Sequence, residues 1–395
     1  MSRRIFVTGI GIISAIGGNV PECLNSLMNS RNGIGMVTLL DTVHKDFPLG
    51  EIKFTNKQLC EIASLADDES LTRTTLLGLI AAKEALKNSG IENVSDSRTG
   101  FISGTTVGGM CRTELAYDKT IPGNIIDTHD CGESTNRIAS ILGINGYSAT
   151  ISTACSSSAN SIMLSARMIQ NGLLDIAIAG GTDSLSRFTL NGFNSLMILD
   201  KDHCKPFDAE RRGINLGEGA AYLVLESEES LAKSNSKPLC ELTGWANAND
   251  AYHQTASSPD GNGAYLAISK AIAKSGLIPE DIDYINAHGT GTDNNDLSEG
   301  IAIERVFGDK VPPISSTKPL TGHTLGASGA IEAVLSVLAI QNKLIYPNLN
   351  FNTKIHELSF TPNKELRTNA IVRNVLSNSF GFGGNNTSLI FSAID

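Results

Sequence analysis

The chain has 395 residues, of which 41% are hydrophobic and 18% charged, and its formal net charge at pH 7 is −10. The length suits two or three domain-sized units, and the composition excludes an intrinsically disordered chain. No long basic run interrupts the acidic balance, which argues against nucleic acid as a partner.

The cysteines and the amino-terminal segment indicate where the protein works. Seven cysteines are scattered without CxxC or Cys/His spacing, which predicts reduced thiols and no metal site. The apolar run from Ile5 is interrupted by Thr8, Gly9 and Gly11, so it indicates a buried strand rather than a signal peptide. No stretch approaches a membrane span. We therefore expect a soluble cytoplasmic protein that does not contact a membrane.

Strand-like and helix-like stretches alternate along the chain, which is the pattern of an α/β protein. In chain order, the predicted strands are Arg4–Thr8, Thr99–Ser103, Ala149–Thr153, Ile176–Ala179, Ala221–Glu226, Ile282–Ala287, Pro313–Ser316, Val375–Ser379 and Ser388–Phe391. The predicted helices are Thr72–Ser89, Ser156–Asn171, Ala264–Ser275, Asp296–Phe307 and Ala327–Gln341.

A short polar stretch at 234–238, Ser-Asn-Ser-Lys-Pro, divides the chain into two parts. On each side, strands lead into loops that carry reactive side chains and then into helices, which is where α/β proteins place their functional groups. We therefore expect two similar halves, residues 1–236 and residues 237–395, although the letters alone show no repeat.

Cys155 is the candidate nucleophile. It follows a short β-rich run directly and precedes a helical pattern, and the small neighbours Ala154 and Ser156 permit a tight turn. A helix N-terminus favours an anion by about 0.3–2 kcal/mol, so we expect the thiol pKa to fall by about one unit. A buried structural cysteine is the alternative, and it is the interpretation that we keep for the other six cysteines.

Two histidines and a lysine also follow predicted strands. His288 ends one strand, and Lys318 and His323 lie between the next strand and the helix that follows it. Each alone fits a structural, hydrogen-bonded residue, but together with Cys155 they favour a shared reactive site. Glu332 lies on that helix and faces either solvent or the site.

The glycine-rich segment Gly381-Phe-Gly-Gly-Asn-Asn386 follows a strand near the C-terminus. Its glycines allow backbone N–H groups to converge on one point, as in a nest that binds an oxyanion. A phosphate loop is a rival interpretation, but the Gly-Lys-Ser/Thr signature is missing. Ordinary hairpin-turn glycines are the other alternative.

Taken together, these segments resemble the elongating β-ketoacyl-acyl-carrier-protein synthases, which are condensing enzymes of the thiolase superfamily. The resemblance covers nearly the whole chain and depends on the order of its motifs. They are Ile5-Phe-Val-Thr-Gly-Ile-Gly-Ile-Ile-Ser14, Thr153-Ala-Cys-Ser-Ser157, Pro206-Phe-Asp208, Gly217-Glu-Gly-Ala220, Asp260-Gly261, His288-Gly-Thr-Gly-Thr292, Lys318 with His323, Gly326-Ala-Ser-Gly329 and Asn378-Ser-Phe-Gly-Phe-Gly-Gly384.

The resemblance implies a thiolase-like, doubled α-β-α-β-α five-layer sandwich with the site between its halves. It implies that the first half carries the nucleophile and that the second carries both histidines and the glycine-rich loop. The implied site residues are Cys155, His288, His323 and Lys318 as catalytic groups, Glu332 as support, the backbone N–H groups of Cys155 and Phe382 as the oxyanion hole, and Phe382 and Val107 as gate and acyl-pocket residues.

The implied reaction is a decarboxylative Claisen condensation of an acyl chain on Cys155 with malonyl-acyl-carrier protein. The implied partners are the acyl carrier protein with its acyl and malonyl thioesters, and a second subunit in a homodimer or a heterodimer. No cofactor is implied, because the phosphopantetheine arm arrives on the carrier. Two rivals remain open: a non-condensing chain-length-factor-like subunit, and a coenzyme-A-dependent thiolase or initiating synthase.

Several positions depart from the family pattern without removing a catalytic residue. They are Lys205, Arg212, Gln254 and the run Asp293-Asn-Asn295. These departures leave open the choice between primary fatty-acid synthesis and a polyketide or aryl-polyene type of pathway. For docking of an acidic carrier, the basic candidates are Lys201, Lys205, Arg211 and Arg212.

Overall fold

The protein is built around a ten-stranded mixed sheet, seen in a computed structural model that describes residues 3–66, 68, 70–117, 127–234 and 236–394. Across the sheet, the strand order is β3-β2-β4-β5-β1-β6-β10-β9-β7-β8. The strands are β1 (Ile5–Ser14), β2 (Thr99–Gly104), β3 (Ser148–Ile151), β4 (Ile176–Asp183), β5 (Gly219–Ser227), β6 (Cys240–Asn249), β7 (Tyr284–Asn286), β8 (Ile314–Ser315), β9 (Asn374–Gly381) and β10 (Asn385–Ser392).

The sheet contains the same five-strand arrangement twice. From each outer edge inward, the strands run third, second, fourth, fifth and first in the chain order of that half. In both halves the first two pairings are parallel and the next two are antiparallel. The halves join where β1 and β6 pair antiparallel at Phe6 and Val7. The two similar halves expected from the sequence are therefore present in the topology.

The exact boundary between the halves stays a prediction. The polar stretch at 234–238 includes Asn235, which lies outside the described residues. β6 was not predicted from the sequence, although it joins the second half to the first.

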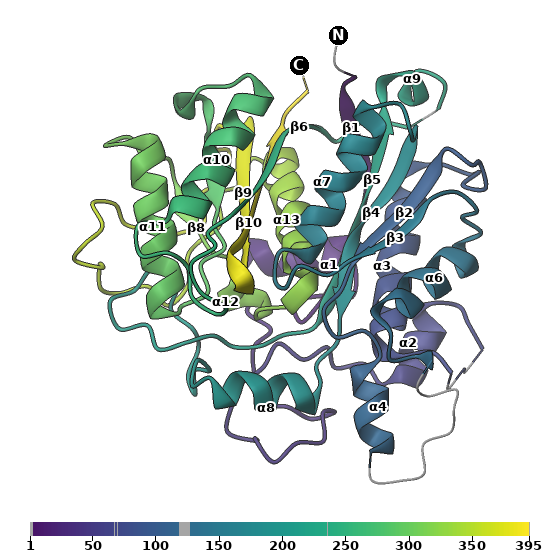
Figure 1. The fold of residues 1–395 in the computed structure, drawn as a ribbon, viewed down its shortest axis with the longest axis horizontal. Helices are drawn as coiled ribbons and strands as arrows, with labels where there is room; N and C mark the ends of the chain where they lie inside the picture. The colour runs from purple at the N-terminus through teal and green to yellow at the C-terminus, as the bar shows by residue number, and fades with distance from the viewer. Residues whose placement is uncertain (1–2, 67, 69, 118–126, 235, 395) are drawn as a thin grey trace.

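The helices form three layers around the two halves of the sheet, so the predicted five-layer order is confirmed (Figure 1). α3 and α6 cover one outer face, α10 and α11 cover the other, and α7 and α13 lie between the halves. The helices are α1 (Val20–Met28), α2 (Asn56–Ile62), α3 (Arg73–Ser89), α4 (Met110–Ala116), α6 (Cys131–Leu142), α7 (Ser157–Gln170), α8 (Arg187–Ser195), α9 (Glu228–Leu231), α10 (Asn262–Ser275), α11 (Asp293–Phe307), α12 (Lys318–Thr321) and α13 (Ser328–Asn342).

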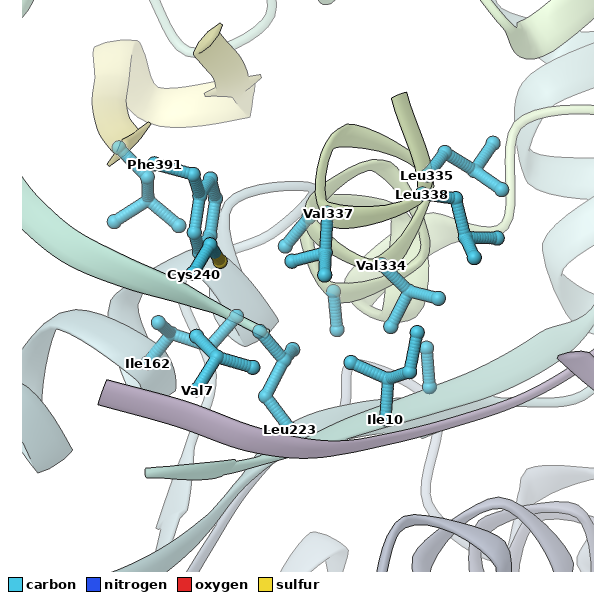
Figure 2. Close-up of a cluster of buried hydrophobic side chains, with 14 of the residues drawn as sticks. Val7, Ile10, Ile162, Leu223, Cys240, Val334, Leu335, Val337, Leu338 and Phe391 are labelled. Atoms are coloured by element: carbon cyan, nitrogen blue, oxygen red, sulfur yellow. The ribbon is translucent and has the colours of Figure 1, made fainter. Parts of the chain in front are cut away.

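The central layer is the apolar core. In Figure 2, side chains of α13 such as Val334 and Val337 meet side chains from β1, β5 and α7, including Ile10, Leu223 and Ile162. Contrary to the expectation that no stretch approaches a membrane span, the segment Leu325–Asn342 is long and apolar enough to cross one by length and composition. However, 89% of this segment is buried inside the protein. Its hydrophobicity is explained by its place between two sheets.

The duplication positions the site. α7 follows β3 in the first half, and α13 follows β8 at the equivalent place in the second. Because α7 contacts α13, the loops that precede these helices meet at one end of the central layer. Those loops carry Cys155 on one side and Lys318 and His323 on the other.

Candidate active site

Cys155 lies in a sharp turn between β3 and α7. The residue before it, Ala154, has a φ of +53°, a left-handed conformation that L-residues rarely adopt. Hydrogen bonds hold the turn: Ser157 Oγ donates to the Ala154 carbonyl at 2.6 Å, and the Thr153 N–H donates to Ser157 Oγ at 2.9 Å. The turn places Cys155 just before Ser156, the N-cap of α7.

The β9–β10 turn approaches this thiol from the second half. The backbone N–H of Phe382 faces the Cys155 sulfur and acts to lower the pKa of that thiol. A Cβ atom at Gly381 would lie 2.8 Å from the Thr153 carbonyl oxygen and 3.2 Å from the Cys155 nitrogen, so only glycine fits there. The predicted glycine-rich segment therefore lies against Cys155. That its N–H groups bind an oxyanion stays a prediction.

A half-buried cluster of amide side chains fixes this turn to the Cys155 turn. Asn385 Oδ1 accepts hydrogen bonds from Ser156 Oγ at 2.9 Å, Asn160 Nδ2 at 2.8 Å and Asn247 Nδ2 at 2.7 Å. The cluster joins α7, β6 and β10, so it sets the spacing between the two halves at the thiol.

His288 and His323 lie together on the other side of the site, with ring centroids 5.4 Å apart and planes nearly perpendicular at 88°. Lys318 Nζ lies 3.2 Å from His288 Nδ1 and donates to the His288 carbonyl at 2.5 Å. Lys318 lies closer in the sequence to His323, but the structure places its ammonium group against His288. An ammonium group can only donate hydrogen bonds, so His288 Nδ1 is the acceptor and the ring proton of His288 is on Nε2.

His323 has the same tautomer for a different reason. The Leu325 N–H donates to His323 Nδ1 at 3.0 Å, and a backbone N–H cannot accept, so the ring proton again sits on Nε2. Burial, followed by the positive charge of Lys318, lowers the pKa of both rings well below its usual value. The site therefore contains two neutral imidazoles, each with one N–H free to donate.

Glu332 faces the site rather than solvent. Its carboxylate pairs with Lys318 Nζ and accepts from Ser379 Oγ at 3.2 Å. Lys318 and Glu332 are each only 3% exposed in their side chains, so the pair is fully desolvated. Each partner compensates the charge of the other, and loss of either one would leave a buried ion uncompensated.

Cys155, both histidines and Phe382 line one cavity of about 260 Å³. The other lining residues are Phe193, Met197, Ile198, Arg212, Ile214, Thr255, Ala256, Ser257, Thr290, Thr292, Asp293, Asn294, Asn295, Phe380 and Gly381. The departures from the family pattern at Arg212 and 293–295 therefore face the substrate space. A cavity that ends on a thiol and two N–H donors suits chemistry on a thioester carbonyl.

Burial raises the pKa of the Cys155 thiol to about 11, against the opposing effects of the Lys318 charge and the Phe382 N–H. The sequence indicated the opposite direction, because only the helix N-terminus could be counted there. Removal of the thiolate from water outweighs that contribution. Cys155 therefore rests as a protonated thiol, and its proton must leave as the sulfur attacks.

This thiol gives a pH-dependent prediction. At pH values below the pKa, the fraction of reactive thiolate rises about tenfold for each unit by which the pH increases. We therefore expect iodoacetamide to alkylate Cys155 about tenfold faster at pH 9 than at pH 8, and about tenfold faster at pH 8 than at pH 7. Mass spectrometry of the Cys155 peptide measures the rate. A plateau reached below pH 9 would contradict a buried, protonated thiol.

Some predicted residues lie elsewhere. Val107 packs in an apolar cluster with Leu190, Ile214 and Leu325 and does not line the cavity, so its acyl-pocket role stays a prediction. Of the docking candidates, Arg211 is 9% exposed and donates to backbone carbonyls. Arg212, in contrast, is exposed at the cavity.

Lys201 is also exposed, but it pairs with Asp46 at 2.7 Å. Lys205 is half-buried. Arg212 is therefore the docking candidate best placed to meet an incoming substrate.

Sequence reasoning missed the groups that hold the His288 loop. On α11, Asp296 accepts from the Gly291 and Phe207 N–H groups, and Glu299 accepts from the His288 and Gly289 N–H groups. Both carboxylates are almost fully buried. Their spacing of three along a helix was the available signal, since it places both on one face.

Phe193 was missed as well. Its ring stacks on Phe382, with centroids 5.7 Å apart. Both rings line the cavity that contains the Cys155 thiol.

Two family descriptions match consecutive parts of the chain: "Beta-ketoacyl synthase, N-terminal domain" over residues 2–230, and "Beta-ketoacyl synthase, C-terminal domain" over residues 239–352. The chain belongs to the β-ketoacyl synthase family. The resemblance stated from the motifs is confirmed, and the protein is an acyltransferase of the condensing type.

Individual relatives agree with the family. The 3-oxoacyl-acyl-carrier-protein synthase 2 of Staphylococcus aureus strain COL is 33% identical over 420 residues, which span 100% of this β-ketoacyl synthase and 99% of that protein. The solved structure of the ishigamide ketosynthase/chain length factor has a TM-score of 0.93 and 31% identity, with 100% of both chains covered.

The ketosynthase ApeO, solved in complex with its chain length factor ApeC from Xenorhabdus doucetiae, has a TM-score of 0.86 and 33% identity, over 99% of this chain and 98% of that one. The predicted thiolase-like fold is confirmed by these structural matches.

Proposed function

We propose that this β-ketoacyl synthase condenses an acyl chain held on Cys155 with malonyl-acyl-carrier protein and releases β-ketoacyl-carrier protein. The observation that carries the proposal is one cavity that joins a thiol, a backbone N–H donor and two neutral imidazole N–H donors. These are the groups that acyl transfer and enolate stabilisation require.

In the first half-reaction, the Cys155 sulfur attacks the thioester carbonyl of the acyl carrier. The Cys155 S–H proton leaves, the carrier thiol departs with a proton, and the acyl group stays on sulfur. The Phe382 N–H already points at this sulfur, and it is placed to stabilise the oxyanion together with the Cys155 N–H. Neither histidine is a general base for this step, because both Nδ1 atoms are occupied by donors and both Nε2 atoms carry protons.

In the second half-reaction, malonyl carrier occupies the same cavity. Its thioester oxygen accepts from the Nε2–H groups of His288 and His323, so loss of carbon dioxide leaves a stabilised enolate. The enolate carbon bonds to the acyl carbonyl carbon, and the bond from that carbon to the Cys155 sulfur breaks. The thiolate is then reprotonated. Neutral rings suit this role, because burial of the site strongly disfavours the charged imidazolium form.

Carrier specificity separates this proposal from a coenzyme-A-dependent thiolase. We expect kcat/KM for condensation to be at least about tenfold higher with acyl and malonyl groups on carrier protein than on coenzyme A, because the carrier adds contacts outside the cavity. Product formation by mass spectrometry measures it, with Cys155→Ala as the control. Equal use of coenzyme A thioesters, or condensation without a malonyl donor, would contradict the proposal.

A second subunit is proposed along β3. The two edges of the sheet differ: both residues of β8 are buried, whereas Ser148 of β3 is exposed and Ala149, Thr150 and Ile151 are half-buried. An open edge strand is a template for pairing with another chain. Another copy, or a related subunit such as the chain length factor of the relatives, fits there. Analytical ultracentrifugation measures the mass of the assembly. The mass of a single subunit, found both for the protein alone and for its mixture with a chain-length-factor-like subunit, would contradict the proposed dimer.

The proposed compartment is the cytoplasm. All seven cysteines are free thiols, as expected where thiols are kept reduced. Cell fractionation tests this assignment, and recovery of the protein outside the cytoplasm would contradict it.

A further inference from the structure

Asp183, at the end of β4, is a buried carboxylate beside the active site that the proposed mechanism does not use. Its residue is 0% exposed. Within the described part of the chain, no Lys, Arg or His forms an ion pair with it. A buried charge without a counter-ion is costly unless several donors hold it, so its partners indicate its purpose.

The partners come from two loops. Oδ1 accepts from Thr105 Oγ1 at 2.6 Å, the Thr106 N–H at 3.1 Å and the Val107 N–H at 3.2 Å. Oδ2 accepts from Thr106 Oγ1 at 2.6 Å and from the Gly326 N–H at 2.7 Å. Backbone N–H groups only donate, so both carboxyl oxygens act as acceptors in these contacts. Burial raises the pKa of Asp183, and the hydrogen bonds from Thr105 and Thr106 oppose that rise.

The Gly326 contact leads to His323. The His323 backbone is fixed independently, because its N–H donates to the Asn215 carbonyl and its carbonyl accepts the Gly217 N–H. The ring, in contrast, accepts at Nδ1 from the Leu325 N–H at 3.0 Å and also lies 3.1 Å from Ser328 Oγ. Leu325 has a φ of +54°. A non-glycine residue holds that conformation only when its neighbours fix it. The next amide along the chain is the one that Asp183 binds.

We propose that Asp183 is a positioning residue: by binding the Gly326 N–H, it holds Leu325 in place and keeps the His323 ring with its Nε2–H available to the substrate. This inference rests on the proposed function, since it concerns the same enolate-stabilising histidine. The same carboxylate also accepts from the N–H groups of Thr106 and Val107, but Val107 does not line the cavity.

The packing around Gly326 agrees with this role. A Cβ atom at position 326 would lie 2.8 Å from Asp183 Oδ2 and 3.1 Å from the Thr106 nitrogen. Gly326→Ala would therefore push the carboxylate away from the turn. This variant therefore tests the hydrogen bond between the Gly326 N–H and Asp183 by changing the donor residue instead of the acceptor.

The experiment compares the two half-reactions in Asp183→Asn. An asparagine has one acceptor oxygen, so its NH2 group must face either the Gly326 N–H or the N–H groups of the 105–107 loop. We expect kcat for malonyl-carrier decarboxylation to fall about tenfold to hundredfold, measured in a Cys155→Gln background. We expect KM for malonyl carrier and the acylation rate, measured with Cys155 intact, to change by less than about threefold.

Two further variants serve as comparison. Thr105→Val removes one hydroxyl donor from the same carboxylate but leaves the Gly326 contact, so its decarboxylation should stay within about threefold of the parent. Gly326→Ala should reproduce the Asp183→Asn pattern. Unchanged decarboxylation in Asp183→Asn, or an equal loss of acylation and decarboxylation, would overturn the proposal.

A spectroscopic measurement makes the proposal independent of the proposed function. With 15N-labelled imidazoles, the wild-type His323 signals should show a single tautomer with the proton on Nε2. Asp183→Asn should shift the Nδ1 signal or populate both tautomers, and Thr105→Val should not. An unchanged His323 spectrum in Asp183→Asn would overturn the inference even if no condensation is found. Absence of condensation in the wild type would instead remove the proposed function alone.

Discussion

Replacement of Cys155 with alanine is expected to abolish condensation, with a loss of at least about 10³-fold in kcat. Among the described residues, Cys155 is the only cysteine that lines the cavity with the two histidines, so no other thiol can accept the acyl chain there. Turnover of acyl and malonyl carrier substrates measures the effect. Cys60→Ala is a matched control, because Cys60 is a buried cysteine in a different apolar cluster.

The same position separates the two half-reactions. Cys155→Gln removes the nucleophile but leaves His288, His323 and Lys318 in place, so we expect decarboxylation of malonyl carrier without condensation. The released carbon dioxide and acetyl carrier measure this activity. Loss of both activities in a folded variant would mean that the enolate-stabilising groups do not act independently of the sulfur.

Replacement of either histidine with alanine is expected to impair decarboxylation and spare acylation, which is the reverse of the effect of Cys155→Gln. Each of His288 and His323 supplies one Nε2–H donor, and loss of a single such donor typically costs about 10²–10³ in rate. Decarboxylation should fall by about that factor, while acylation of Cys155 continues, because neither ring offers it a base.

The control for these variants is His356→Ala, since His356 is exposed. Separate single-turnover assays of acylation and decarboxylation measure the two effects. If the histidine variants lost acylation as strongly as decarboxylation, one of the rings would have to serve the nucleophile directly.

Much of the fold was predictable because the hydrophobic pattern of each segment matches the residues that the folded protein buries. The helices after Cys155 and His323 have apolar positions in the sequence that coincide with buried residues in the structure. β6 was missed because Cys240–Asn249 contains Gly244 and several Asn and Ala residues, which have low strand propensity. Its pairing with β1 and β10 makes it a strand, and that information lies elsewhere in the chain.

The site was predictable in its membership but not in its details. The order of motifs placed Cys155, His288, His323 and Lys318 together, and the structure brings them together. The partner of Lys318 was not predictable, because the His288 and His323 loops both lie within reach of a long side chain. The direction of the Cys155 pKa was not predictable either, since burial outweighs the helix terminus and the sequence does not show it.

The most direct test of the account is to trap the acyl-enzyme. The protein is incubated with an acyl thioester on carrier protein but without malonyl carrier, digested, and mapped by mass spectrometry. The account predicts one acyl group per chain on the peptide that contains Cys155, and its disappearance when malonyl carrier is added. An acyl group on a different cysteine, or full condensing activity with no acyl group on Cys155, would contradict it.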